Sequence, residues 1–454
     1  MQSTITFHGG AGSVTGSNFL LDTGSEKILI DCGIQQGTKE AEAANAKPFA
    51  YDLSAIQFLI VTHAHMDHIG RIPKLVRDGF KGVIYSTEAT RALAEPLLRD
   101  ELALMMHEKH PRNTDAPAPL YDEANIERSF ALWKGISYHE QTPLGSVTLE
   151  LLNSGHILGS AIAKFSRDGK SIAFTGDLGS GNSPLLPLCE EPAGIDYLVM
   201  ESVYGDRTRN DTDRKERLEN VIEEANKRGG TLLIPAFSTE RTQDLLYEIR
   251  TLMQAHRIPL MPVYLDSPLA EKITDSYLAH PSYFAQAIQD EIKQHGNIFK
   301  FPQLKFVQSM DESRQLEHLP SPKIILAGSG MAQGGRVVGH EERLLPDKKT
   351  TELIVGYQAA GTIGRRLIEG ASSIKLYGSD VPVRARIEQI YGYSAHMDGE
   401  QLLEFVNKIH TSLKKVFVVM GEPAASTSLV QKLRDYLGTN AVAPDAGESA
   451  TIEL

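Results

Sequence analysis

The sequence predicts an α/β protein with two domains, and three observations support this prediction. The chain has 454 residues, more than a single hydrophobic core usually serves. From about residue 207, short apolar runs alternate with helical segments, a pattern typical of a parallel, doubly wound sheet. Before that point, the apolar run 58–61 leads into a cluster of metal-binding residue types. We therefore expect a sheet-based domain that carries chemistry and a second domain of alternating strands and helices.

Composition and charge narrow the classes of protein to consider. The formal net charge is −12, from 58 acidic and 46 basic residues, which argues against a protein that coats nucleic acid. A nucleic-acid enzyme stays open, because bound divalent metal and a few arginines can make one cleft positive. The 2 cysteines are too few for a disulfide framework, and no secretory signal or membrane-spanning run is evident. We expect a cytoplasmic protein with no membrane partner.

The opening segment alternates apolar runs with glycines, which predicts the first strands of a sheet. The run 27–30 ends at Asp31, one residue before Cys32-Gly33. An aspartate at the end of an apolar strand can reach into a site at the edge of the sheet. It can equally be a turn residue before Gly33, and the local sequence does not choose between the two interpretations.

The strongest chemical signal is the spacing H-x-H-x-D-H directly after the run 58–61. Alternate side chains of a strand point the same way, so His63 and His65 can face one metal ion. Asp67 and His68 lie past a bend, where a helix would begin, and can face a second ion. Imidazole and carboxylate are ligands of catalytic zinc. A surface position on a loop would explain one such histidine, but three histidines and an aspartate directly after a buried strand favour a metal site.

Three later strands each end at a polar side chain. His156 lies in a loop of small residues after an apolar segment, and the run 171–174 leads to Asp177 in a glycine-flanked turn. The run 197–200 ends at Glu201. Each could be turn chemistry when taken singly. Together with the H-x-H-x-D-H cluster, however, His156 and Asp177 supply the third histidine and the carboxylate that a dinuclear site needs.

Arginines and a glycine-rich loop in the second domain are candidates for contacting phosphate. Arg241 lies at a predicted helix start after a strand, and the pair Arg365 and Arg366 lies at another. The loop 328–335 also joins a strand to a helix, and its backbone amides could hold phosphate; it begins with Gly328, Ser329 and Gly330. It lacks the G-x-G-x-x-G fingerprint of nicotinamide-binding proteins. Tight turns and solvated charges are the alternative, which we favour for the glycines taken alone.

The last part of the chain returns to the first domain. His396 precedes a predicted helix, where on its own it is more simply a capping or surface residue. We expect the strand 416–419 and the helix 428–437 to belong to the first domain. The second domain is therefore an insertion: we expect residues 1–206 and 373–454 to form the first domain, and 207–372 the inserted one.

H-x-H-x-D-H with His156 and Asp177 downstream resembles the metallo-β-lactamase superfamily. Further segments resemble its β-CASP branch, which comprises RNA- and DNA-processing nucleases: 201–206, 235–243, 266–270, the loop 328–335, the segment from Gly361, and Ser394-Ala395-His396. The resemblance covers nearly the whole chain. It implies an αββα metallo-β-lactamase sandwich with an inserted doubly wound α/β (β-CASP) domain, and two zinc ions in the cleft between the domains.

The resemblance also implies a role for each candidate residue. It assigns six ligands to two zinc ions: His63, His65 and His156 to the first, Asp67 and His68 to the second, and Asp177 as a bridge. Asp31 matches the strand-end aspartate that supports the site of this family. Glu201 matches the first acidic motif of the branch. His396 matches the histidine that is taken to pair with this acid and to protonate the leaving group.

One position departs from the family pattern. Relatives usually have His-Gly-Glu after the last strand, and that histidine completes the second zinc site. Here the segment reads Met420-Gly421-Glu422, and a thioether is a poor zinc ligand. We expect the second metal to bind weakly, or to take water or another residue instead. The N-terminal RNA-binding extension of some archaeal relatives is also not evident, so we expect RNA to be held by the two domains or by a partner.

The function that these observations predict is zinc-dependent hydrolysis of phosphodiester bonds in single-stranded RNA, in RNA processing or decay. Paired metals would activate water and hold the phosphate, and His396 would donate a proton to the leaving oxygen. A small-ester or thioester hydrolase with the same metals is one alternative, which the inserted domain disfavours. A non-catalytic scaffold subunit of an RNA-processing complex is another, which Met420 keeps open. Endonuclease and exonuclease activity are both compatible with the sequence. So are a DNA substrate in place of RNA, and a homodimer.

Overall fold

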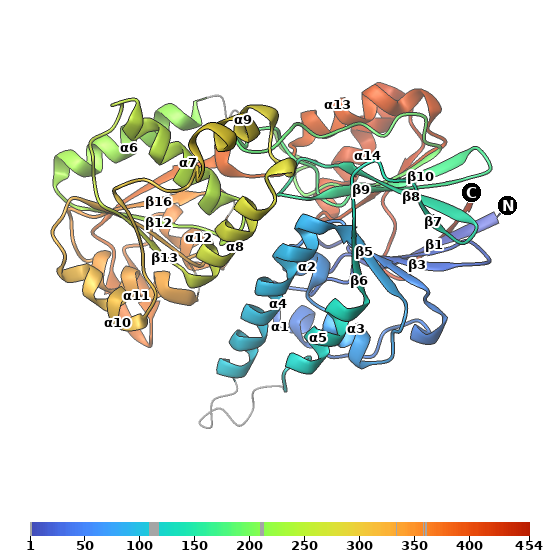
Figure 1. Ribbon diagram of the computed structural model, residues 1–454, viewed down its shortest axis with the longest axis horizontal. Helices are drawn as coiled ribbons and strands as arrows, with labels where there is room; N and C mark the ends of the chain where they lie inside the picture. Colours follow the sequence, from blue (N-terminus) through green and yellow to red (C-terminus); the bar gives the residue numbers. More distant parts are fainter. Residues whose placement is uncertain (1, 109–117, 209–212, 333, 357, 359–360) are drawn as a thin grey trace. The chain divides into compact units, whose positions relative to one another are not determined.

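The computed structural model describes residues 2–108, 118–208, 213–332, 334–356, 358 and 361–454. The chain divides into two compact units (Figure 1). The first unit comprises residues 1–181, 186–208 and 395–454, and the inserted unit comprises residues 182–185 and 209–394. Within the described residues, no helix is both long enough and apolar enough to cross a bilayer.

Two seven-stranded sheets form the first unit. The first sheet contains, in spatial order, β22 (Ser449–Glu453), β1 (Gln2–Gly9), β2 (Asn18–Asp22), β3 (Lys27–Ile30), β4 (Phe58–Ile60), β5 (Val83–Thr87) and β6 (Trp133–Ile136). The second contains β21 (Ala441–Val442), β20 (Lys415–Val419), β11 (Tyr197–Glu201), β10 (Lys170–Phe174), β9 (Ala161–Arg167), β8 (Val147–Asn153) and β7 (Thr142–Leu144). Each sheet has an antiparallel part and a parallel part; β3 to β6 are parallel in the first, and β21, β20, β11 and β10 in the second.

The core of the first unit lies between its two sheets. Phenylalanines from both sheets meet there, and the rings of Phe7 on β1 and Phe417 on β20 are 5.4 Å apart. Along β1, buried side chains alternate with more exposed ones, so one face of this strand enters the core. β10 and β11 are apolar almost throughout because a second cluster covers their other face, with Leu402 and Leu429 from two helices.

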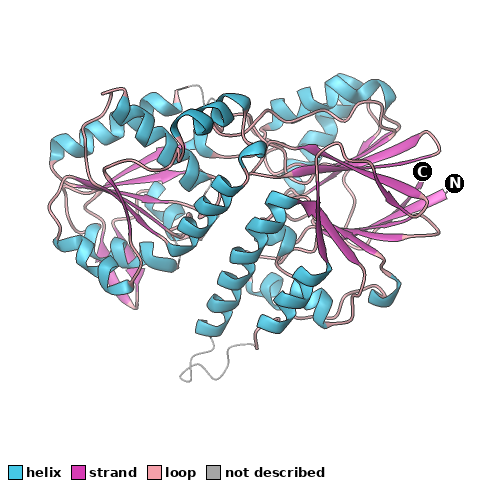
Figure 2. Cartoon of the chain, in the orientation of Figure 1, coloured by secondary structure: helices cyan, strands magenta, loops and turns pink. Residues whose placement is uncertain are grey.

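Helices cover the outer faces of both sheets (Figure 2), which gives an αββα sandwich. The first sheet is accompanied by α1 (Lys39–Ala44), α2 (Met66–Ile69), α3 (Ile72–Arg77), α4 (Glu88–Glu108) and α5 (Glu123–Leu132). The second is covered by α13 (Gly399–Ile409) and α14 (Pro423–Leu437). At the start of α13, Asp398 and Gln401 form a capping box that fixes the first turn. The predicted fold class is confirmed.

The inserted unit is a doubly wound α/β domain. The six strands of its main sheet are all parallel, in the spatial order β14 (Leu304–Phe306), β13 (Val263–Asp266), β15 (Lys323–Ala327), β12 (Thr231–Pro235), β16 (Thr351–Val355) and β19 (Arg386–Ile390). Figure 1 shows helices on both faces of this sheet. They are α6 (Arg214–Arg228), α7 (Arg241–Gln254), α8 (Pro268–Ala279), α9 (Gln286–His295), α10 (Met310–Gln315), α11 (Gly335–Leu344) and α12 (Ile363–Ile368).

The inserted unit extends further along the chain than the predicted 207–372. After α12 the chain forms the hairpin β17 (Ser373–Leu376) and β18 (Ser379–Pro382), and then β19 pairs with β16 in parallel. The hairpin broke the strand-helix alternation, so its short strands resembled a return to the first domain. In the structure, β19 closes the parallel sheet, and the unit ends at Ser394.

Candidate metal centre

Parallel strands of both sheets in the first unit end at the candidate site. Asp31 follows β3 and His63 follows β4, whereas Asp177 follows β10 and Glu201 ends β11. The carboxyl ends of neighbouring parallel strands share one edge of a sheet, where ligands bind in many α/β folds. The order of the strands therefore gathers polar side chains that are far apart in the sequence.

A bend after β4 divides the H-x-H-x-D-H motif. His63 lies in the segment that leaves the strand, and His65 takes the N-cap position of α2 with extended backbone angles (φ −70°, ψ 148°). Asp67 and His68 lie in the first turn of α2. The helix begins where the sequence analysis expected it, so the bend separates His63 and His65 from Asp67 and His68 along the chain.

Three histidines and one carboxylate form a first group of ligand atoms. Nδ1 of His65 lies 3.1 Å from Nε2 of His63 and 3.1 Å from Nε2 of His156. Oδ2 of Asp177 lies 3.4 Å from each of these Nε2 atoms. Tetrahedral zinc with bonds of about 2.0–2.1 Å would space its ligands about 3.3 Å apart. The group therefore has the dimensions of one zinc site.

The other oxygen of Asp177 faces a second group. Oδ1 lies 3.3 Å from Nε2 of His68, and Oδ2 of Asp67 lies 3.7 Å from the same nitrogen. His68 and Asp177 are buried, and neither Nε2 nor Oδ1 has a hydrogen-bond partner in the described structure. An unsatisfied buried polar atom costs about 1–3 kcal/mol. A cation between the two atoms would remove that cost, so these residues fit a divalent metal.

Asp31 fixes the orientation of His68 from behind. Its Oδ2 lies 2.7 Å from Nδ1 of His68, and its Oδ1 accepts a hydrogen bond from the backbone N–H of Thr62 at 2.8 Å. Ser17 donates to Oδ2 at 3.1 Å. Because Nδ1 of the imidazole is engaged by Asp31, the ring turns Nε2 toward Asp177. Of the two interpretations of Asp31, this contact favours the support of a site over a simple turn residue.

Burial and neighbouring charges shift the pKa values of these groups in different directions. Burial lowers the pKa of His65 and His156 well below the usual value, and adjacent histidines add to the effect, so both are neutral. Burial alone would also lower the pKa of His68, but Asp177, Asp31 and Asp67 together raise it well above its usual value. The pKa of Asp177 is held well below its usual range, against the effect of burial, by His68 and His63. The cluster therefore concentrates negative charge around the second group.

Glu201 and His396 form a pair beside the first group. Nδ1 of His396 lies 3.2 Å from both carboxylate oxygens of Glu201, and the backbone N–H of Leu178 donates to Oε1 at 2.6 Å. The rings of His396 and His156 are 4.6 Å apart. Burial would lower the pKa of His396, but Glu201 raises it above its usual value. The structure thus brings His396 to the ligand cluster, and it belongs to the first unit.

Met420 follows β20 at the same edge of the sheets. Its φ of 48° lies in the left-handed region, which is uncommon for methionine, and its N–H donates to the carbonyl of Gly10 at 2.6 Å. The side chain is 2% exposed and belongs to the core between the sheets. A Cβ on Gly10 would lie 2.4 Å from its Sδ, so the thioether is packed against this glycine.

The candidate phosphate-binding residues all belong to the inserted unit. Arg241 begins α7, stacks on Phe237 and donates from Nε to the carbonyl of Tyr393 at 3.0 Å. Arg365 and Arg366 lie exposed on α12, where Arg365 is paired with Glu369.

Packing explains one of the glycines in the loop after β15, the loop that is also a candidate for binding phosphate. A Cβ on Gly330 would lie 2.3 Å from the Phe237 ring, so only glycine fits there. Gly328 and Ser329 precede it in the same loop, at the carboxyl end of β15. The tight-turn interpretation is therefore sufficient for Gly330.

Two supporting residues were missed in the sequence analysis. Thr62 contacts both oxygens of Asp31 through its hydroxyl, and Ser17 donates to the same carboxylate. A hydroxyl residue directly before the first histidine of the motif was the available signal for Thr62. Ser17 carried no such signal, because it comes from a loop between β1 and β2 that only the folded sheet brings close.

Three family descriptions match successive parts of the chain. Residues 11–232 match the metallo-beta-lactamase superfamily, 242–367 the Beta-Casp domain, and 380–444 the Zn-dependent metallo-hydrolase RNA specificity domain. Together these matches extend over both the first unit and the inserted unit.

Several proteins are similar over most of their length. Ribonuclease TTHA0252 of Thermus thermophilus is 35% identical, over 88% of this chain and 89% of that protein. An RNase J-like protein of Methanocaldococcus jannaschii is 32% identical, over 94% of this chain and 95% of the relative. Transcription termination factor FttA of Methanosarcina mazei is 32% identical, over 94% and 68%. A protein of unknown function from Enterococcus faecalis shares the fold, with a TM-score of 0.60, 14% identity and 100% coverage of both chains.

Proposed function

This chain belongs to the β-CASP branch of the metallo-β-lactamase superfamily, and we propose that it is a zinc-dependent ribonuclease that hydrolyses phosphodiester bonds of single-stranded RNA. Its relatives include a named ribonuclease, and its last family match is an RNA specificity domain. The observation that carries the proposal is Asp177, whose two oxygens face two separate groups of ligand atoms.

The ligands that we propose follow from that arrangement. His63, His65 and His156 would hold the first zinc, and Asp67 and His68 would hold the second, with Asp177 shared between the two groups. When bound, the two ions supply an activated water and positive charge that stabilises the phosphate in in-line attack. Because Met420 carries a thioether where imidazole would suit zinc better, we propose that the second ion binds more weakly than the first.

The protein's own residues orient the ligands and move a proton. Asp31 holds the His68 ring with Nε2 toward the site, since it accepts a hydrogen bond from Nδ1. Glu201 holds His396 by Nδ1 and favours its protonated form. We assign His396 as the donor of the proton that the leaving oxygen needs when the phosphodiester bond breaks. Asp67 and Asp177 keep that region negative until metal binds.

The inserted unit offers the proposed contacts to neighbouring phosphates. Arg241 supplies guanidinium N–H groups beyond the one that binds Tyr393, because this side chain has five donors. The backbone of Gly328, Ser329 and Gly330 and the exposed pair Arg365 and Arg366 are the further candidates. Contacts of this kind position a strand without reading its sequence.

The proposal is tested with end-labelled single-stranded RNA and a matched DNA strand, each with added zinc and with chelator. We expect RNA to be hydrolysed with zinc and left intact with chelator. Internal cuts and released mononucleotides give different product ladders, which separates endonuclease from exonuclease activity. Turnover of acyl-glutathione without RNA cleavage would instead indicate an ester or thioester hydrolase. Less than one zinc per chain with no cleavage would indicate a scaffold subunit.

A further inference from the structure

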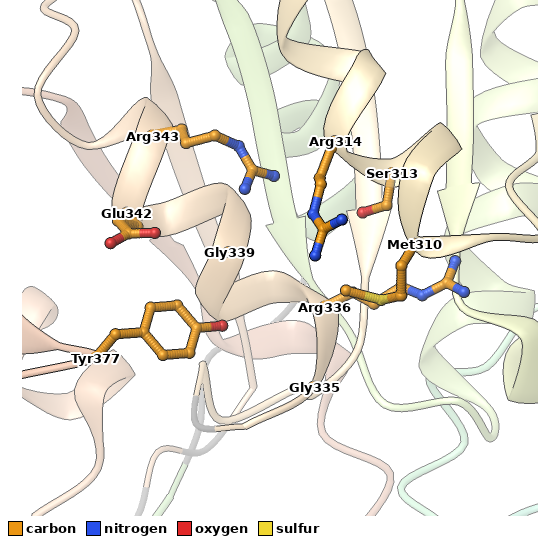
Figure 3. A pocket seen from close by; sticks show the side chains of 9 residues that line it. All are labelled: Met310, Ser313, Arg314, Gly335, Arg336, Gly339, Glu342, Arg343 and Tyr377. Carbon is orange, nitrogen blue, oxygen red and sulfur yellow. The ribbon is translucent and has the colours of Figure 1, made fainter.

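A hollow of about 300 Å³ lies in the inserted unit (Figure 3), away from the proposed metal ligands in the sequence and made from other elements. Its walls come from α10, from α11 and from the hairpin β17–β18. This volume is at the lower end of the range for small-molecule sites, about 300–1,000 Å³. The lining side chains with polar groups are Ser313, Arg314, Arg336, Glu342, Arg343 and Tyr377.

Two guanidinium groups converge on this hollow. Figure 3 shows Arg314 from α10 and Arg343 from α11 pointing into it, with the hydroxyl of Tyr377 directed toward the same space. Arg314 is 66% exposed, and it pairs with Asp311 three residues earlier, an interaction that water weakens. Arg343 uses Nε for Glu317 at 2.8 Å, which leaves other N–H groups of its five donors.

Two of the lining residues are glycines of α11. Gly335 begins α11 and Gly339 lies inside it, although glycine inside a helix costs about 1 kcal/mol relative to alanine. A Cβ on Gly339 would lie 3.3 Å from Nη1 of Arg343. The missing side chain thus leaves room for the Arg343 guanidinium over the helix and for a ligand beside it.

A buried carboxylate holds the walls in place. Asp266, at the end of β13, is completely buried and accepts from Ser313 at 2.5 Å and from Arg336 at 2.5 Å. Nε2 of His340 lies 2.6 Å from the same carboxylate. Nη2 of Arg343 lies 3.3 Å from Nδ1 of His340. Since arginine can only donate, Nδ1 accepts, and His340 carries its proton on Nε2 and donates it to Asp266.

This network does not form a hydrolytic Ser-His-Asp triad. Ser313 gives its proton to Asp266, and Nε2 of His340 is committed to the same carboxylate. No lone pair of His340 therefore faces Ser313 to act as a base. The network instead fixes Arg336 and, through His340, Arg343, so that little side-chain freedom is lost when a ligand binds.

Beside Met310, Tyr377 provides the apolar part of the hollow. It lies in the turn between β17 and β18 and is 70% exposed, so its ring does not stabilise the core. Aromatic rings at such positions stack on bases, and guanidinium groups pair with phosphate oxygens. We propose that this hollow binds a phosphate-bearing nucleotide, with the phosphate between Arg314 and Arg343 and the base on Tyr377; as a subsite for one nucleotide of an RNA strand, it rests on the proposed function.

The test measures binding separately from cleavage. Full-length protein with Asp177→Asn, chosen to prevent turnover, is titrated with fluorescent single-stranded RNA and, separately, with a free nucleoside monophosphate. We expect Tyr377→Ala in this background to raise Kd about fivefold or more for the ligand that uses the hollow, and Arg314→Gln to raise it severalfold. Both side chains are exposed and outside the Asp266 network, so the variants should fold.

Two matched variants make the result specific. Lys293→Gln removes the same charge from an exposed pair three residues apart in the same unit, and we expect it to leave Kd unchanged. Glu342→Gln removes the carboxylate that lines the hollow, and we expect it to tighten binding. An effect on RNA alone identifies a subsite for the strand, and an effect on the monophosphate identifies a nucleotide site. If Tyr377→Ala and Arg314→Gln match Lys293→Gln with both ligands, the inference is wrong, whether or not the unaltered protein cleaves RNA.

Discussion

Oδ1 of Asp177 lies 3.3 Å from Nε2 of His68, and both atoms are buried without a hydrogen-bond partner in the described structure. The opposite oxygen of the same carboxylate faces His63 and His156. Two buried atoms that each lack a partner would destabilise the fold by about 1–3 kcal/mol apiece. A cation between the two atoms would satisfy both of them.

Asp177→Asn should lower metal content and abolish RNA hydrolysis while the fold is retained. The amide keeps the shape of the side chain but removes the charge that faces His68 on one side and His63 and His156 on the other. We expect the number of metal ions per chain, measured by inductively coupled plasma mass spectrometry, to fall by one or more. The circular dichroism spectrum should stay the same. Asp435→Asn, an exposed carboxylate on α14, is the control. Full metal content in the Asp177 variant would contradict the bridging role.

Met420→His should strengthen binding of the second metal ion. The residue follows β20 at the edge where the other strand ends supply ligands, and its φ of 48° is tolerated by histidine more readily than by most side chains. We expect zinc per chain to rise after dialysis against limiting zinc. Met420→Leu, which removes the sulfur but keeps the bulk, separates a coordination effect from packing against Gly10. Unchanged stoichiometry in Met420→His would mean that this position does not face the second ion.

Glu201→Gln and His396→Gln should slow hydrolysis without removing metal. A positioned acid contributes about 10²–10⁴-fold to the rate, and the two residues act through one contact, Nδ1 of His396 with the Glu201 carboxylate. We expect each variant to lose activity within that range, and the double variant to lose little more than His396→Gln alone. Independent, multiplicative losses would show that Glu201 acts separately from His396. Metal content serves as the control measurement in all three proteins.

Much of the first unit could be predicted because its signals are local. The H-x-H-x-D-H spacing and the bend at α2 depend on residues within one short segment, and the strands before Asp31 and Asp177 are marked by continuous apolar runs. The resemblance to a known family then supplied the roles. The contact between Asp31 and Thr62 was not predictable, because it depends on the parallel pairing of β3 with β4.

The end of the inserted unit and the nucleotide hollow escaped prediction for the same physical reason. β19 reads as an isolated short strand after the β17–β18 hairpin, and only its pairing with β16 assigns it to the inserted sheet. Arg314 and Arg343 come from helices separated by β15, and nothing in their local sequence shows that they meet. Both features depend on contacts between segments that are distant in the sequence.

The buried pair Glu341 and Glu352 should make the inserted unit less stable as pH rises. Both side chains are completely buried, on α11 and β16. Burial raises the pKa of Glu352 to about 8, and burial together with Glu352 raises the pKa of Glu341 to about 10.

Between about pH 4.5 and pH 8, the folded chain binds more protons at this pair than the unfolded chain does. Unfolded glutamates lose their protons near pH 4.5, whereas the folded pair keeps them, so stability falls as pH rises from about 4.5 to about 8. Each retained proton costs about 1.4 kcal/mol per pH unit in this window. Glu341→Gln removes one of the two ionisable groups, and we expect the loss of Tm between pH 5.5 and pH 7.5 to be clearly smaller in this variant than in the unaltered protein. Glu216→Gln, exposed on α6, should keep the original pH dependence. An equal slope in the Glu341 and Glu216 variants would show that the buried pair is already ionised in the folded protein.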